Sequence, residues 1–303
     1  MQNLSANTGK KASFGYNYDT HRIITRKALE YVPELTNKGG AIAQYLSNGL
    51  IRENFLKSST IMQELAMHND RKFAGESLNK LAINYQAFRA LVQKAEPDNG
   101  NLVKKFVNEL ADSSMLPDLL NSETGFLTNR HFYFKPDSKG RGRKSFGFST
   151  NENNAFNAYL THINRMFQHK QNAVDVSREA GMAIHFLQDM TVPLHTRKQS
   201  FLGKVVDFFM HKNFETGILV NQEKLAQNYT PGFKKLEKSL GEKHNNHFDL
   251  FLSNVDFSSK KNLQINRNNK KEWARIQQTI FNRAVDSTVL ELKNIAREFS
   301  KTN

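Results

Sequence analysis

Residues 180–195, AGMAIHFLQDMTVPLH, decide the expected fold and its chemistry. Apolar side chains recur every three or four positions in this stretch, which predicts an amphipathic helix that ends near Pro193. His185 and Asp189 are four positions apart, so they lie on one face of that helix. His195 follows in the turn beyond it. The stretch therefore predicts a helix that presents two metal-ligand side chains, with a third just past its end.

A second stretch, VVDFFMHKNFETGILV at 205–220, repeats this arrangement. His211 and Glu215 are again four positions apart, so an imidazole and a carboxylate share one face of an apolar helix. Such a pair can hold one ion of zinc size. Either pair alone is more often a buried hydrogen bond or ion pair. Two pairs in adjoining helices, with His195 between them, favour a metal site.

Apolar residues at the same helical spacing recur through much of the chain and predict an all-α fold. They fall at 23–29, 106–110, 155–167 and 276–292. Alternation with a period of two is hard to find, and Asn99-Gly100 is expected in an interhelical loop rather than a hairpin. We expect breaks in the helices at 38–40, 97–100, 135–142 and 229–232, and a solvated basic loop at 258–271.

The length and composition describe a globular chain. Its 303 residues are 38% apolar and 24% charged, which excludes disorder of the whole chain. We expect a flexible N-terminal segment at 1–13 and a single multi-helix catalytic domain at 14–303. The net charge is 43 − 29 = +14, which favours anionic partners such as phosphate esters, nucleic acid or acidic lipid headgroups. With zero Cys, a metal site must be built from His and carboxylates.

The location of the protein stays open at this stage. The N-terminal twenty residues lack the apolar stretch of a secretory signal, and no uncharged run approaches the length that spans a membrane. We therefore expect a soluble chain that is either cytoplasmic or secreted by a specialised route.

The two paired motifs together resemble a known metal centre. The string His185-x3-Asp189-x5-His195, followed by His211-x3-Glu215, is similar to the trinuclear zinc site of bacterial zinc-dependent phospholipases C. The related fungal single-strand nucleases share the first three positions. In the phospholipases, as here, the last motif contains an aromatic residue and ends in Glu, whereas the nucleases end it in Asp.

Three weaker upstream matches follow the order of that family: DTHR with His21, LPD with Asp118 and NRHFY with His131. The resemblance implies a cluster of two to three zinc ions and a role for Asp118 as the catalytic residue that orients or deprotonates the attacking water. It assigns Asp118, His131, His185 and Asp189 to one zinc ion, His195, His211 and Glu215 to a second, and His21 with the far oxygen of Asp189 to a third.

The third zinc site is expected to be the weakest or an altered one. In secreted family members the mature chain begins with a Trp whose free amine and carbonyl complete this site, but here Phe14 is the first candidate aromatic residue and thirteen residues precede it. Either cleavage before Phe14 exposes an amine, or the carboxylate of Asp19 takes its place. Because no processing signal is visible, we favour substitution or partial occupancy of this site over cleavage.

The resemblance implies a phospholipase C that cleaves glycerophospholipids at a membrane surface into diacylglycerol and a phosphorylated headgroup. A single-strand nuclease or nucleotidase is the alternative, since the positive charge suits a phosphate-tracking surface. Those nucleases usually contain disulfide cysteines and a Gly-His first motif, and this chain has neither. A non-catalytic lipid- or nucleic-acid-binding protein with a structural metal is a third possibility, although a closed site needs only four ligands. No protein partner is inferred.

Two further features were interpreted from the sequence. The apolar segment 200–210, SFLGKVVDFFM, lies either in the core or against lipid near the mouth of the site. The five remaining histidines are expected to be surface or core residues, and the HxxH formed by the last two is only a weak metal-like pattern. They are His68, His162, His169, His244 and His247.

Overall fold

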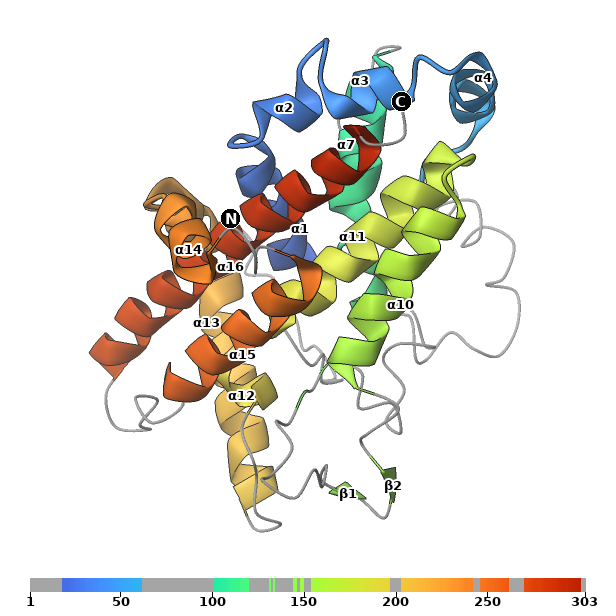
Figure 1. The fold of residues 1–303 in the computed structure, drawn as a ribbon. Coiled ribbons are helices and arrows are strands. Elements are labelled where there is room, and N and C mark those ends of the chain that lie inside the picture. Colours follow the sequence, from blue (N-terminus) through green and yellow to red (C-terminus); the bar gives the residue numbers. More distant parts are fainter. Residues whose placement is uncertain are drawn as a thin grey trace, which may run out of the picture.

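The computed structural model describes residues 18–61, 101–119, 131, 133, 144–145, 148–149, 154–196, 203–241, 246–261 and 270–300. Within these ranges the protein is built almost entirely of helices (Figure 1). The prediction of an all-α fold is confirmed. The helices are α1 (Tyr18–Leu29), α2 (Pro33–Thr36), α3 (Ala41–Tyr45), α4 (Gly49–Lys57), α7 (Leu102–Ser113), α8 (Leu116–Leu119), α10 (Ala155–Gln168), α11 (Ala173–Asp189), α12 (Pro193–Thr196), α13 (Gly203–Gln227), α14 (Phe233–Leu240), α15 (His247–Lys261) and α16 (Lys270–Ser300).

Four of these helices begin in the same way, with an asparagine as the N-cap. The side-chain oxygen of each asparagine accepts a hydrogen bond from a backbone N–H of the first turn, which would otherwise lack a partner. The capping residues are Asn48 for α4, Asn101 for α7, Asn154 for α10 and Asn172 for α11. These asparagines therefore mark the beginnings of the four helices in the local sequence, independently of tertiary contacts.

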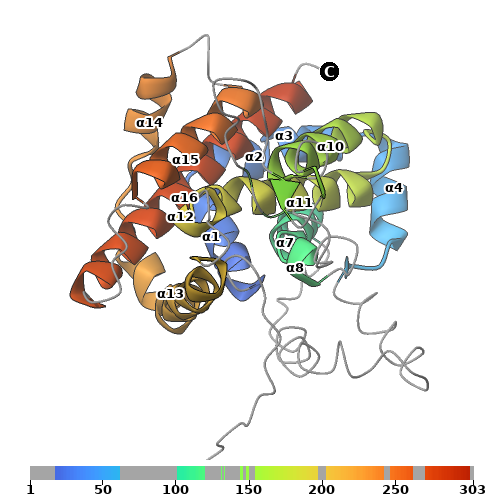
Figure 2. The same ribbon diagram turned by 90° about the horizontal axis from the view of Figure 1, so that it is seen from below.

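Helix α11 lies between α10 and α7, as Figure 2 shows. Most of its residues are buried, so it forms the centre of this half of the molecule. Gly181 allows α7 to approach closely, because a Cβ atom at this position would lie 2.3 Å from the carbonyl oxygen of Leu110. The close approach brings the end of α7 and the short helix α8 alongside the C-terminal half of α11.

The long helix α16 joins the remaining elements into one core. It contacts α1, α11, α13, α14 and α15, and crosses the molecule in Figure 1. The buried apolar residues form one continuous cluster, which extends from Ile24 in α1 to Phe299 in α16. The histidine- and carboxylate-rich ends of α1, α8, α11 and α12 are therefore held within a packed frame.

The predicted helical patterns at 23–29, 106–110, 155–167 and 276–292 fall inside α1, α7, α10 and α16, and the breaks at 38–40 and 229–232 are observed. The predicted loop at 258–271 is wrong at its start and end. Helix α15 continues to Lys261, α16 begins at Lys270, and 262–269 lie outside the described residues. The predicted breaks at 97–100 and 135–142 and the expected flexible segment 1–13 also lie outside them.

Two other details differ from the sequence-based expectation. Helix α11 ends at Asp189, and His195 lies in the short helix α12, which begins at Pro193, rather than in a plain turn. Proline suits this first helical position because its missing N–H would have had no partner there. A two-stranded antiparallel ribbon, β1 (Lys144–Ser145) with β2 (Phe148–Ser149), was not expected.

The helices of the described ranges include none that combines the length and the apolar character needed to cross a membrane.

Candidate metal centre

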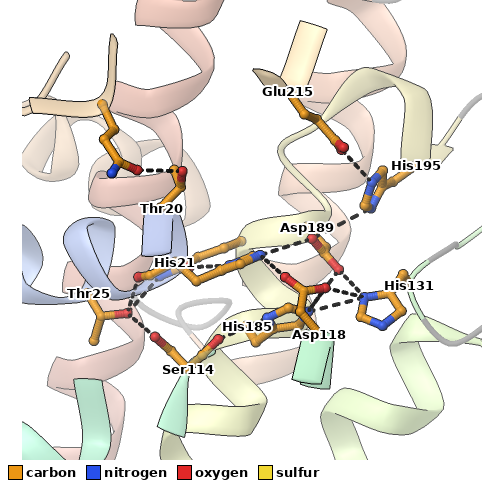
Figure 3. Close-up of polar contacts among 12 residues, drawn as sticks. Thr20, His21, Thr25, Ser114, Asp118, His131, His185, Asp189, His195 and Glu215 are labelled. Atoms are coloured by element: carbon orange, nitrogen blue, oxygen red, sulfur yellow. Dashed lines mark hydrogen bonds and ion pairs between the residues drawn. The ribbon is translucent and has the colours of Figure 1, made fainter. Parts of the chain in front are cut away.

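Seven of the eight predicted ligand residues converge in the interior of the protein (Figure 3). All seven side chains are buried, and they come from six separate parts of the chain. They are His21 on α1, Asp118 on α8, His131 before α10, His185 and Asp189 on α11, His195 on α12 and Glu215 on α13. The backbone of the eighth residue, His211, lies in α13 one turn before Glu215, but its side chain is outside the described residues.

Asp189 is the centre of the cluster, because each of its oxygens faces two imidazoles. The Oδ2 atom lies 2.8 Å from Nδ1 of His131 and 3.3 Å from Nε2 of His185. The Oδ1 atom lies 3.5 Å from Nε2 of His21 and 3.7 Å from Nδ1 of His195. A carboxylate with ligands on both sides is suited to bridge two metal ions.

Asp118 approaches the same group from α8. Its Oδ2 atom lies 3.7 Å from Nε2 of His21, and its Oδ1 atom lies 3.8 Å from Nε2 of His185 and 4.0 Å from Nδ1 of His131. These are longer than hydrogen bonds, and within the described residues neither oxygen accepts one. Ligand atoms of His21, His185 and Asp189, and those of Asp118, His131 and His185, lie within 4.8 Å of one another.

Glu215 extends the cluster on the side of α12 and α13. Its Oε1 atom lies 3.4 Å from Nε2 of His195, whose other ring nitrogen faces Asp189. His195 therefore connects the carboxylate of α13 to the centre of the cluster. This is the place where the sequence predicts a second ion, with His211 as a further ligand.

Burial and mutual charge shift the pKa values of these groups, and the lowered pKa values of Asp189, His21 and His185 suit metal binding. Burial, with the charges of Asp189 and Glu215, raises the pKa of Asp118 well above its usual range. Burial also disfavours the charged form of Asp189, but the neighbouring His185 and His195 outweigh it and hold its pKa well below the usual range. Burial is the main cause of the lowered pKa values of His21 and His185. These two imidazoles are thus neutral at neutral pH and keep a lone pair for a cation.

The donor set fits a divalent metal ion. Three buried carboxylates and four imidazoles offer oxygen and nitrogen atoms, which zinc accepts readily. Within the described ranges, the ion-pair partners of Asp118 and Asp189 are all histidines. A buried carboxylate without a hydrogen-bond donor or a fixed positive charge costs free energy, which a bound cation would offset. The residues could hold a metal, and the geometry by itself does not select zinc.

Contacts behind two of the imidazoles were not predicted from the sequence. The Nδ1 atom of His21 is 2.7 Å from Oε1 of Gln188, and Nδ1 of His185 is 2.9 Å from the carbonyl oxygen of Ser114. Gln188 could have been suspected, because it is one turn after His185 on the same helix. The role of Ser114 could not, since it uses a backbone atom that any residue carries.

Asp19 does not join the cluster. Its Oδ2 atom accepts a hydrogen bond of 2.9 Å from Nε2 of Gln222 on α13. Positions two apart on a helix point to nearly opposite sides, so Asp19 is turned away from the carboxylates that His21 faces. The structure thus gives no support for Asp19 as the replacement ligand of a third zinc site, and Phe14 lies outside the described residues.

The histidines that were expected to be ordinary surface or core residues have local partners where they are described. His162 and His247 contact the carboxylates of Glu179 and Glu291 at 2.6 and 2.8 Å, and His169 is an exposed residue 3.6 Å from Asp175. His68, His244 and the side chains of the apolar segment 200–210 lie outside the described residues.

No family model, curated protein or solved structure matches this chain. The interpretation of the cluster therefore depends on its geometry and on the spacing of its residues.

Proposed function

We propose that this protein is a zinc-dependent phosphodiester hydrolase, similar to the bacterial zinc-dependent phospholipases C. The convergence of four imidazoles and three carboxylates in one buried cluster carries this proposal. A closed structural zinc site uses four ligands, so a larger set favours more than one ion. Clustered divalent ions are a common solution for phosphodiester hydrolysis, in which both the attacking and the leaving oxygen carry charge.

The proposed assignment of ligands follows the distances around the two carboxylates of α8 and α11. Asp118, His131, His185 and Asp189 would hold one ion, and His195 and Glu215, with His211, a second. His21 lies 3.5 Å from Oδ1 of Asp189 and would take part in a third site. The third site is the least complete, because Asp19 faces α13 instead.

When bound, zinc supplies Lewis acidity, which lowers the pKa of water and draws charge from a phosphoryl oxygen. The chain's own contribution is to hold a proton acceptor in place. Asp118 would be that acceptor, because neither of its carboxylate oxygens accepts a hydrogen bond from the described residues, so one oxygen could contact the ion while the other takes up the proton of the attacking water. Asp189, with its lowered pKa, stays ionised beside it. The two aspartates thus divide the roles of proton acceptor and permanent anion.

Glycerophospholipids are the proposed substrates, at a membrane surface. This choice depends on the motif His211-Lys-Asn-Phe-Glu215, which follows the phospholipase pattern rather than the nuclease one. A single-strand nuclease is the second candidate, favoured by the net charge of +14. Both activities would use the same metal cluster and would differ in the residues around the cluster that contact the substrate.

The test is hydrolysis by the zinc-loaded protein of two substrates in parallel: mixed vesicles of phosphatidylcholine, phosphatidylethanolamine and phosphatidylserine, and a single-stranded DNA oligonucleotide. Phosphorus NMR would detect the released phosphorylated headgroup. We expect headgroup release from vesicles, its loss on chelation and its return with zinc. Asp118→Asn should be inactive, whereas the exposed-site control His169→Ala should keep full activity. Cleavage of DNA alone would favour the nuclease, and cleavage of neither would reject the proposed function.

A further inference from the structure

We propose that Gln188 is a positioning residue that fixes the ring of His21 in the tautomer whose Nε2 lone pair faces Asp118 and Asp189. The inference rests on the metal centre of the proposed function and adds a residue to it. Gln188 immediately precedes Asp189, so its side chain is rotated by about 100° from that carboxylate around α11. It points towards α1 and α16 and is completely buried.

The orientation of the Gln188 amide follows from the two hydroxyl groups beside it. Its Nε2 atom lies 3.0 Å from Oγ1 of Thr25 and 3.1 Å from Oγ1 of Thr288. Each threonine has an acceptor elsewhere for its single proton. Thr288 donates to the carbonyl oxygen of Ala284 at 2.8 Å, and Thr25 donates to that of His21 at 2.9 Å or to Oγ of Ser114 at 3.2 Å. With their protons placed in this way, both hydroxyls accept from the amide. This network places the nitrogen of the amide against the threonines and its oxygen against His21.

The tautomer of His21 then follows. The Oε1 atom of Gln188 can only accept a hydrogen bond, and Nδ1 of His21 lies 2.7 Å from it. Nδ1 must therefore carry the proton, which in a neutral imidazole leaves Nε2 with its lone pair. Nε2 lies on the side of the two aspartates, 3.5 Å from Asp189 and 3.7 Å from Asp118. A metal ion placed there would find a nitrogen ligand already in the required form.

His185 provides an internal comparison. Its Nδ1 atom lies 2.9 Å from the carbonyl oxygen of Ser114, which also can only accept, so its Nε2 atom also carries the lone pair. The two rings lie close together, with centroids 3.9 Å apart. One ring is oriented by a backbone atom that no substitution removes, and the other by a side chain that can be replaced. Gln188 is thus the point at which the orientation can be tested.

The experiment uses the full chain labelled with ¹⁵N-histidine, with and without zinc. Gln188→Met removes the acceptor while keeping a side chain of similar length, and Gln188→Glu keeps the acceptor. Gln278→Met on α16 is the matched control, because Gln278 donates to the carbonyl oxygen of Leu225 and is not among the residues of the cluster. Two-dimensional ¹⁵N–¹H spectra would show which ring nitrogen of His21 carries the proton, and competition titration would measure zinc affinity.

We expect the wild type, Gln188→Glu and Gln278→Met to keep the Nδ1–H form of His21 in the metal-free protein. Gln188→Met should lose it and should bind the zinc ion nearest to His21 10- to 100-fold more weakly, which is the usual effect of removing such an outer contact. An unchanged tautomer in Gln188→Met, or an equal loss of affinity in Gln278→Met, would overturn the proposal.

The tautomer of His21 is measured without metal and without substrate. The measurement therefore tests the role of Gln188 independently of the proposed function. If Gln188→Met does not fold, Thr288→Val tests the same chain of contacts, because it removes one acceptor of the amide while leaving its oxygen. We expect a mixture of the two His21 tautomers in Thr288→Val. A wild-type protein that shows the Nδ1–H form but hydrolyses neither vesicles nor DNA would reject the hydrolase and leave the role of Gln188 standing.

Discussion

Glu109 and Asp118 both carry buried carboxylates and lie on neighbouring helices. The two carboxylates differ in their hydrogen-bond partners. Glu109 on α7 is 2% exposed and Asp118 on α8 is 6% exposed, and both contact groups on α11. Glu109 accepts a hydrogen bond of 2.7 Å from Nε of Arg178 and further bonds of 2.9 Å from the backbone N–H of Ile61. Asp118 accepts none from the described residues, and its neighbours are imidazoles.

The comparison separates a structural carboxylate from a candidate ligand. Burial raises the pKa of both groups, but at Glu109 the guanidinium of Arg178 and the N–H of Ile61 oppose that effect. Protein groups therefore complete the surroundings of Glu109, whereas those of Asp118 offer a place that a cation could fill. Burial alone would not have distinguished the two.

The largest effect is expected from replacing the residue at the centre of the cluster. Asp189→Ala removes the carboxylate that faces four imidazoles, so hydrolysis should fall by at least about 1,000-fold. Elemental analysis should show the loss of at least one zinc ion. The control, His169→Ala, changes an exposed residue and should match the wild type in both measurements. Full turnover by a metal-depleted Asp189→Ala protein would show that the site is misassigned.

Replacing Glu109 should affect stability instead of metal content. Glu109→Ala leaves the partly buried guanidinium of Arg178 without its carboxylate, which should lower the free energy of unfolding by about 3 kcal/mol. Urea unfolding of the metal-free protein measures this loss. Zinc content below the unfolding midpoint should stay at the wild-type value. A loss of zinc in the folded variant would contradict the distinction between the two carboxylates.

Removal of the metal should destabilise the protein, because the ligands come from helices that are far apart in the sequence. Free zinc at 100 times its dissociation constant would contribute about 2.7 kcal/mol per site. The melting temperature should therefore fall on chelation in the wild type and by the same amount in Glu109→Ala. Asp189→Ala should show a smaller fall. An unchanged melting temperature after verified removal of metal would argue against this linkage.

The smallest effect on stability, and the one with an unusual sign, is expected for Asp118→Asn in the metal-free protein. The raised pKa of Asp118 means that the folded metal-free protein binds more protons than the unfolded chain above pH 3.8, the ordinary value of the group. Its contribution to stability therefore falls as pH rises towards the folded pKa. The substitution removes this decline and should stabilise the metal-free protein at neutral pH by about 1 kcal/mol.

The same substitution should weaken zinc binding, so the order of stability reverses when zinc is present. Melting curves of both proteins between pH 4 and 8, with chelator and with zinc, provide the measurement. If Asp118→Asn were less stable than the wild type in chelator at every pH, the carboxylate would be favourably placed without a metal.

The sequence predicted those contacts of the site that follow from the periodicity of a single helix. The spacing of His185 and Asp189 placed both on one face of α11, and they do meet in the cluster. The upstream residues His21, Asp118 and His131 were predicted from order and motif, and the structure brings them to the same point. Their roles as zinc ligands stay a prediction.

What the sequence could not provide depends on how helices from distant parts of the chain are placed side by side. Asp19 is close to His21 in sequence, yet the turn of α1 directs it to Gln222. Gln188 acquires its role only because α1 and α16 bring Thr25 and Thr288 to its amide. Neither contact has a local pattern, because each depends on the packing angle between helices.

The positions of the ligands along the chain also determine when, during synthesis of the protein, the cluster can first assemble. Its ligands begin at His21 and extend to Glu215, and the contact that orients His21 needs Thr288 on α16. At roughly 5 to 20 residues per second, the ribosome needs about 15 to 50 s to make the chain between these points. During that interval the early ligands are hydrated side chains with no fixed geometry. A metal ion that needs the complete cluster could therefore bind only after the last of these residues has been made.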